Sequence, residues 1–319
     1  MDVVFITESQ YQKLTNAPED SKYRAVFAWM TMICFWSTLF IRFLFIEVTY
    51  TDENLLRFRE VPPDDLEALL CLMLYILGFL TFSLFVIFGF TERFYLERRM
   101  IHRLRWVDLA IFCSWIYVPW LIENIYNTRM ILFFTSCVIV GLCLNRKRFR
   151  LIGFHAPIKK TLLFFAIIFA FGLIQVVQSV GIYINSYLGI DQYSDRENSI
   201  KNSYQMNTDA TMNAFSSVSS SSASSNAALT FLAVCLLAPI AEEILFRGYL
   251  QTLFTHYVGR IFSVILTALL FSLYHVDVAS FFPLFFTGII FGIFREVFKS
   301  VWAASALHMF MNMLFSLFF

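Results

Sequence analysis

Long apolar runs divide this 319-residue chain, and shorter polar segments separate them. A helix needs about 20 apolar residues to cross a hydrocarbon layer about 30 Å thick. The runs predict an all-α fold, a polytopic transmembrane helical bundle of about 8–9 spans. The short fourth and seventh runs leave the count open, because a tilted or re-entrant helix would change it. The predicted spans are Ala25–Ile46, Ala68–Phe90, Trp106–Ile122, Met130–Leu144, Thr161–Ile184, Ala227–Phe254, Ile261–Tyr274, Ala279–Phe294 and Val301–Phe319.

Polar segments divide the chain into three parts. Residues 1–184 hold five predicted spans, residues 185–226 form a long polar loop, and residues 227–319 hold the last four spans. Eight of the ten residues from Ser216 to Ser225 are serine, which is typical of a flexible spacer. Residues 52–67 hold six acids and two arginines around Pro62-Pro63, and we expect a loop there.

Basic residues predict the orientation of the bundle. The segment Arg93–Arg105 carries five arginines, and residues 145–160 carry six lysines and arginines without any acid. Cytoplasmic loops hold an excess of these residues, so both segments are predicted to be cytoplasmic. Nine alternating spans then place the N-terminus in the cytoplasm. The first 20 residues are polar and give no sign of a cleavable signal.

Composition agrees with a membrane protein. The chain is 59% hydrophobic and 15% charged, whereas soluble domains are about 45–50% apolar and about 25% charged. The net charge of +1 points to no particular partner, and we expect no nucleic-acid binding. The six cysteines lie in apolar runs without a CxxC pair, so we expect small buried side chains rather than disulfides or zinc ligands.

Three ionisable residues lie within one apolar run, Pro239–Arg247. Ionisable side chains inside a membrane are costly, and they indicate a functional site by default. Glu243 and Arg247 are four residues apart, one turn along the same face, and should form an ion pair. Glu242 points about 100° away from that pair. It therefore offers a second carboxylate for general acid–base chemistry.

Two further polar pairs follow at the same i, i+4 spacing. Phe271 and His275 share one helix face, and so do His308 and Asn312. A carboxylate and an imidazole can deprotonate a water, while a second imidazole and a carboxamide can donate to an oxyanion. Each motif alone is more typical of a structural role. Their occurrence in order within 71 residues favours a functional site.

A metal site is the alternative for the same groups. Two histidines and a glutamate form a known zinc set. The HExxH pattern is absent, however, and the candidate ligands come from three different helices. We therefore expect no cofactor, with a divalent metal such as zinc as the open alternative. The pattern singles out no serine or cysteine nucleophile.

Counting along each predicted helix gives an estimate of depth. Glu242, His275 and His308 lie roughly 22, 21 and 10 Å from the starts of their helices at about 1.5 Å per residue. Because successive helices alternate in direction, Glu242 and His308 are expected to meet in the cytoplasmic half of the bilayer. The same count places His275 too far towards the outer side.

The three motifs together resemble the CAAX protease and bacteriocin-processing family of intramembrane proteases, also called the Abi family. That family carries EExxxR, FxxxH and HxxxN on consecutive late helices. The flanks match as well, with Ala-Pro-Ile-Ala before the first motif and Gly248-Tyr-Leu-Gln after it. The resemblance covers residues 227–319. The matching segments are Glu242-Glu243-Ile-Leu-Phe-Arg247, Phe271-Ser-Leu-Tyr-His275 and His308-Met-Phe-Met-Asn312.

The resemblance implies a glutamate-dependent endopeptidase inside a helical bundle. It implies that Glu242 and His275 activate the water. It further implies that His308 and Asn312 stabilise the oxyanion, and that Glu243 and Arg247 orient the site. The implied partners are the lipid bilayer and a membrane-associated, in some members lipidated, protein or peptide substrate.

Eukaryotic members of that family cleave the last three residues from prenylated CAAX proteins. This chain has Val276-Asp277-Val278 where those enzymes carry further histidines, and so it is more similar to the prokaryotic members. We therefore expect a multi-pass protein of a prokaryotic plasma membrane, and we do not predict CAAX processing. Two other functions stay open: a non-proteolytic scaffold or immunity protein, and a transporter. A transporter would predict inverted repeats, which the sequence does not show.

Overall fold

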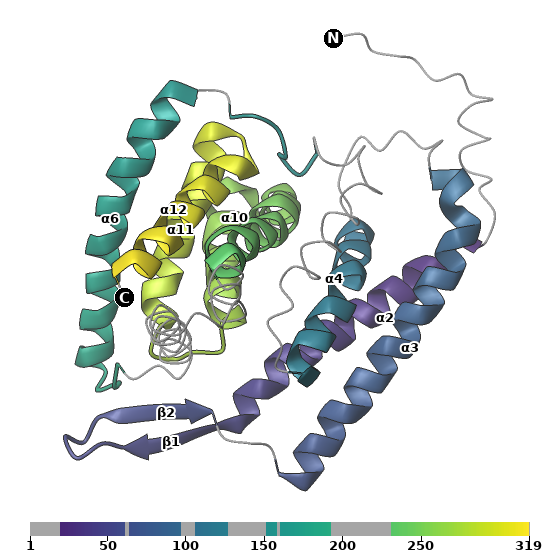
Figure 1. Cartoon of the computed structure of the whole chain (residues 1–319), viewed down its shortest axis with the longest axis horizontal. Coiled ribbons are helices and arrows are strands. Elements are labelled where there is room, and N and C mark those ends of the chain that lie inside the picture. The colour runs from purple at the N-terminus through teal and green to yellow at the C-terminus, as the bar shows by residue number, and fades with distance from the viewer. Residues whose placement is uncertain are drawn as a thin grey trace, which may run out of the picture.

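In the computed structural model, helices form almost all of the regular structure (Figure 1). The structure describes residues 20–60, 64–96, 106–126, 151–157, 160–192 and 231–318. In chain order the helices and strands are α2 (Asp20–Ile41), the 3₁₀-helix η1 (Arg42–Phe45), β1 (Ile46–Tyr50), β2 (Leu56–Glu60), α3 (Asp65–Leu96), α4 (Trp106–Tyr126), α6 (Lys160–Tyr187), the π-helix η3 (Ala233–Leu237), α9 (Ala238–Glu243), the π-helix η4 (Ile244–Leu250), α10 (Gln251–Tyr274), α11 (Phe281–Phe298) and α12 (Val301–Phe318).

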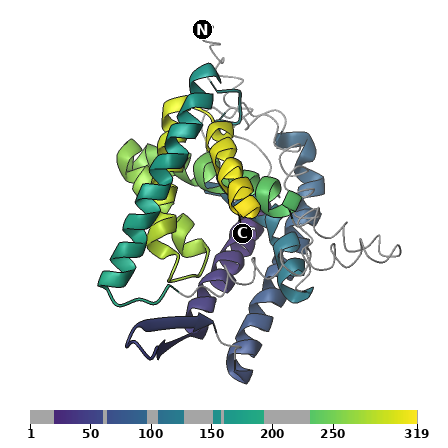
Figure 2. The ribbon, with the colours of Figure 1, turned by 60° about the vertical axis from the view of Figure 1, so that its left-hand side comes forward.

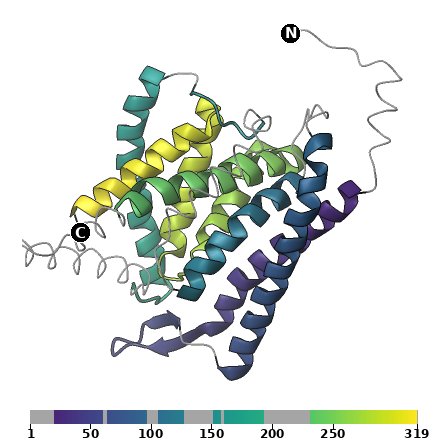
Figure 3. The ribbon, with the colours of Figure 1, turned by 45° about the vertical axis from the view of Figure 1, so that its right-hand side comes forward.

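The helices form two groups that lie side by side. Helices α2, α3 and α4 make the first group, and α6, α10, α11 and α12 make the second (Figures 1 and 3). Helix α4 joins the two groups through aromatic contacts. Phe112 stacks on Tyr249 with 4.7 Å between ring centroids, and Trp106 meets Phe254 edge-on at 5.6 Å. Figure 2 shows α6 running along the outside of the second group.

The prediction of a helical membrane bundle is confirmed. Five stretches of helix in the described residues are long and apolar enough to cross a membrane, and α4 and α12 hold shorter apolar helices. The predicted span Met130–Leu144 lies outside the described residues, as does most of the predicted loop 185–226. The span count and the three-part division therefore stay predictions. The five long stretches are Tyr23–Phe45, Asp65–Phe88, Thr161–Tyr187, Val234–Tyr274 and Phe281–Phe298.

The outer helices expose apolar side chains of the kind that contact lipid. Phe169 on α6 is 74% exposed, and Phe164, Phe165 and Tyr183 on the same helix are also exposed. Apolar surface in water costs roughly 25 cal/mol per Å². A continuous face of this kind is therefore stable only against hydrocarbon or another protein surface.

One segment differs from the predicted loop at residues 52–67 and from a purely α-helical fold. Strands β1 and β2 pair antiparallel, with Ile46 opposite Glu60 and Tyr50 opposite Leu56. Strand β1 is rich in β-branched and aromatic residues, which favour a pleated strand. Asn54 takes a left-handed conformation (φ 60°) in the tight turn, where asparagine is tolerated. The acids and prolines of this segment favoured a loop, so the two short strands were not predicted.

A helical hairpin positions the first two motifs. Gly259 lies within α10 at φ 80° and ψ 173°, a conformation that essentially only glycine adopts. The chain reverses there: Phe246 meets Phe271 with 5.3 Å between centroids, and Thr255 Oγ1 lies 2.8 Å from Ser263 Oγ. The midpoints of both pairs lie within half a residue of Gly259. Residues Val234–Tyr274 therefore form two antiparallel arms, here called the Gly259 hairpin, as the two separate predicted spans require.

Helix α11 packs closely against this hairpin because two glycines face it. A Cβ on Gly288 would lie 3.1 Å from Ala268 Cβ, and a Cβ on Gly292 would lie 2.9 Å from Val264 Cγ1. Small residues one turn apart allow such close approach between membrane helices. The close contact brings the Gly288 and Gly292 carbonyl oxygens within reach of polar side chains on the hairpin.

Candidate active site

The glutamate pair lies on a short helix between two wide turns. Helix α9 ends at Glu243, the π-helix η3 precedes it and the π-helix η4 follows it. Wide π turns inside helices are frequent at functional sites. Arg247 belongs to η4 and is fully buried, as is Glu243.

Glu243 and Arg247 form the ion pair that their spacing predicts. Arg247 Nη1 donates to Glu243 Oε1 over 2.9 Å, and Arg247 Nη2 donates to the Gly288 carbonyl over 2.9 Å. The guanidinium also lies over the Phe271 ring, 4.5 Å from its centroid, which adds a cation–π contact. The arginine thus ties the first motif to the second motif and to α11.

His308 joins this ion pair from α12. Its Nδ1 lies 3.1 Å from Glu243 Oε1, and its ring stacks on Phe291 with 4.7 Å between centroids. Because a carboxylate only accepts, Nδ1 carries the proton and donates to Glu243. This bond and the stacking fix the plane of the imidazole and direct Nε2 away from Glu243.

Glu242 lies at the edge of the same group. Its Oε2 is 4.0 Å from His308 Nε2, and its side chain is 18% exposed, whereas Glu243 is fully buried. The two acids thus have different surroundings: one is locked by Arg247 and His308, and the other faces the more open side. The structure brings together Glu242, Glu243, Arg247 and His308.

His275 ends the second arm of the hairpin. The Phe271 carbonyl oxygen accepts a hydrogen bond from His275 Nδ1 over 2.8 Å. The ring proton is therefore on Nδ1, and the lone pair is on Nε2. The His275 ring contacts Phe271 at 4.8 Å, and Phe271 also contacts His308 at 5.9 Å. Val276 follows in a left-handed conformation (φ 51°), which strains a β-branched residue. Strain of this kind clusters at active sites.

The predicted depth of His275 was wrong. Both arms of the hairpin start from the turn at Gly259, and the Phe246–Phe271 and Thr255–Ser263 pairs set their register. The same register places residue 275 level with residue 242. Depth counted from the starts of the apolar runs failed, because those runs do not begin at equal heights.

Asn312 is the last residue of the third motif, and its side-chain amide binds the helix that leads into the first motif. Asn312 Nδ2 donates to the Val234 carbonyl over 2.8 Å. In the wide turn of η3 that carbonyl would accept from residue 239, which is proline and has no N–H. The carboxamide therefore supplies the hydrogen bond that Pro239 cannot.

Two contributors were missed by the sequence analysis as site residues. Gly288 allows α11 to approach the hairpin, and its carbonyl binds Arg247. Phe291 stacks on His308, and nothing in an apolar run singles out one phenylalanine among many. Within the described ranges, no three His, Cys, Asp or Glu side chains gather as metal ligands would. A metal-free site stays a prediction.

Comparison with known families agrees with the geometry. The family described as Type II CAAX prenyl endopeptidase Rce1-like matches residues 224–314, which include all three motifs. No curated protein and no solved structure matches the chain. A match to this family points to a peptidase in a lipid bilayer. Residues 224–314 of this membrane protein are thus similar to the Rce1-like family, in agreement with the predicted resemblance to the CAAX protease family.

Proposed function

We propose that this protein is an intramembrane endopeptidase that hydrolyses a peptide bond of a membrane-associated protein or peptide. The observation that carries the proposal is the buried Glu243–Arg247–His308 network, which holds His308 Nε2 4.0 Å from Glu242 Oε2. A scaffold would gain nothing from directing an imidazole nitrogen at a second, more open carboxylate.

The 4.0 Å separation suits a shared reacting oxygen. It is too long for a direct hydrogen bond, but two bonds of about 2.8 Å that meet on one oxygen at about 90° span about 4.0 Å. We assign that position to the oxygen of the attacking water. Glu242 takes its proton, the oxygen attacks the peptide carbonyl, and the proton passes to the leaving amine.

Geometry supports His308 as a donor to the developing oxyanion. The hydrogen bond from His308 Nδ1 to Glu243 leaves Nε2 as the ring atom nearest Glu242. We assign the oxyanion to an N–H at Nε2.

His275 and Asn312 complete the proposed machinery. The bond from His275 Nδ1 to the Phe271 carbonyl fixes the plane of the imidazole, and we assign His275 to orienting the water beside Glu242. Asn312 donates one of its two amide protons to the Val234 carbonyl. That bond holds α12 against η3, and the second amide proton is the one assigned to the oxyanion.

The test is cleavage of a quenched fluorescent peptide by the full chain in nanodiscs. The peptide is presented in lipidated and in membrane-embedded form, so that the assay also reports the substrate class. Glu242→Ala and His275→Ala should each lower the rate at least about 100-fold, as for loss of a general base. An exposed control, Arg59→Gln on β2, should cleave like the parent. Unchanged cleavage in both site variants would end the proposal.

We place the N-terminus in the cytoplasm on the lysine and arginine bias of the loops. We place the protein in a prokaryotic plasma membrane because Val276-Asp277-Val278 departs from the eukaryotic members of the family. A reporter fused within residues 185–226 should then report from the outer side. A cytoplasmic signal from that fusion would refute this orientation.

A further inference from the structure

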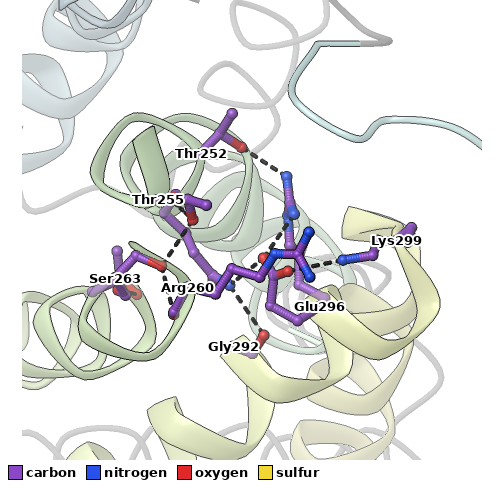
Figure 4. Close-up of polar contacts among 10 residues, drawn as sticks. Thr252, Thr255, Arg260, Ser263, Gly292, Glu296 and Lys299 are labelled. Atoms are coloured by element: carbon purple, nitrogen blue, oxygen red, sulfur yellow. Dashed lines mark hydrogen bonds and ion pairs between the residues drawn. The ribbon is translucent and has the colours of Figure 1, made fainter. Parts of the chain in front are cut away.

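A second polar cluster lies beyond the active site, at the closed end of the Gly259 hairpin. It consists of Arg260 from the hairpin and Arg295, Glu296 and Lys299 from the C-terminal end of α11 (Figure 4). The proposed reaction uses none of these residues. We call this group the hairpin-end cluster.

Glu296 is the acid of this cluster, and its oxygens are fully engaged. Oε1 accepts from Arg295 Nη1 over 2.8 Å and from Gln251 Nε2 over 3.1 Å, and Oε2 accepts from Lys299 Nζ over 3.0 Å. The side chain of Arg260 extends towards the same carboxylate (Figure 4). Arg295 and Lys299 thus share one anion, and with Arg260 the cluster carries an excess of two positive charges.

The positive charge of Arg295 is fixed in position by burial and by hydrogen bonds. Arg295 is only 13% exposed and donates its Nη2 to Thr252 Oγ1 over 2.8 Å. Its buried Nε has no hydrogen-bond partner among the described residues. Arg260 is exposed and Lys299 is 41% exposed, so both can reach a ligand at the surface.

The segment that holds Gly153 lies against the cluster. Gly153 approaches Arg295, since a Cβ on Gly153 would lie 3.6 Å from Arg295 Nη2, and its carbonyl accepts from the Val301 amide. The six residues before residue 151 in the chain include four lysines and arginines and no acid. The lysine and arginine bias assigns this end of the bundle to the cytoplasmic side.

Apolar side chains adjoin the cluster and point outward. Tyr257, Ile261 and Phe262 beside the hairpin turn are 63%, 75% and 64% exposed, and Val297 on α11 is 61% exposed. A soluble anion would gain nothing from these side chains. A ligand with an anionic headgroup and acyl chains would match both the charge and the apolar rim.

We propose that the hairpin-end cluster binds the phosphate of an anionic phospholipid in the cytoplasmic leaflet. Arg260 and Lys299 contact the phosphate, Arg295 adds the field of a fixed charge, and the apolar side chains around the turn lie against the acyl chains. Basic residues near a membrane surface attract anionic lipids in this way.

The test is lipid binding by the full chain, followed by native mass spectrometry. Phosphatidylglycerol and phosphatidylcholine with the same acyl chains are titrated into the detergent-solubilised protein. Phosphatidylglycerol should bind the parent more tightly. Each lost charge should weaken it roughly fivefold, so Arg260→Gln/Lys299→Gln should bind it about 25-fold more weakly. Arg59→Gln, the same change on strand β2, should bind like the parent.

Three results would overturn the proposal. They are equal affinity for the two lipids, unchanged phosphatidylglycerol binding by the double variant, and full displacement of the lipid by millimolar inorganic phosphate. The last result would show a site for a free anion. If the double variant does not elute as a folded monodisperse protein, Arg260→Gln alone decides, because that side chain is exposed. The readout is binding, so it is independent of whether the protein cleaves peptides.

Discussion

Replacing Arg247 with methionine removes the charge that balances Glu243 inside the bundle. The lost contacts are the 2.9 Å bond to Glu243, the 2.9 Å bond to the Gly288 carbonyl and the cation–π contact with Phe271. Removing one partner of a buried ion pair costs about 3–5 kcal/mol. His308 still donates to Glu243, so we expect about 3 kcal/mol, at the low end.

The double variant Glu243→Gln/Arg247→Met separates the buried charge from the lost packing. It removes both charges, and the remaining deficit is an unmatched Gly288 carbonyl, at about 1–3 kcal/mol. Arg247→Met alone should therefore be the less stable protein, by about 1–2 kcal/mol if the buried charge dominates.

Thermal unfolding of both variants in the same nanodisc measures this order. Arg59→Met, at an exposed position on β2, serves as the control and should melt like the parent. If the double variant melts at or below the temperature of Arg247→Met, the charge argument is wrong. Loss of packing around Phe271 and Phe291 would then account for the defect.

Three further predictions follow from the hairpin and the third motif. Gly259→Ala should destabilise the protein by about 1–3 kcal/mol, because alanine is strained at φ 80°; thermal melting beside Gly172→Ala, an α6 glycine with open space around it, measures this. Asn312→Leu should cost about 1–3 kcal/mol, because the Val234 carbonyl loses its donor; parent-like melting would contradict that account. Peptide cleavage should persist after dialysis against a chelator, and activity restored only by added zinc would establish the metal alternative.

Contacts within one helix were predictable from residue spacing alone. Glu243 and Arg247 are i, i+4 neighbours, and the structure pairs them at 2.9 Å. Phe271 and His275 have the same spacing, and their rings lie 4.8 Å apart. Residues four apart lie about one turn along a helix, so such pairs meet wherever the helix lies. The membrane class was predictable for a similar reason, since only apolar runs satisfy a hydrocarbon environment.

Contacts between helices were predicted less well. The estimated depths correctly predicted that Glu242 lies near His308. They placed His275 too far towards the outer side, because the depth of His275 depends on the turn at Gly259. The hydrogen bond from Asn312 to Val234 arises because Pro239 lacks an N–H. That requirement is visible only once α12 lies beside η3.

Sequence by itself thus determined which residues are the candidates for the chemistry and which of them share a helix face. Tertiary structure decided how the three faces meet. It made Glu243 the shared acceptor of Arg247 and His308, and it placed Glu242 at the more open edge. The physical reason is that helix geometry is local and periodic, whereas the heights of neighbouring helices depend on turns and on close approach at glycines such as Gly288.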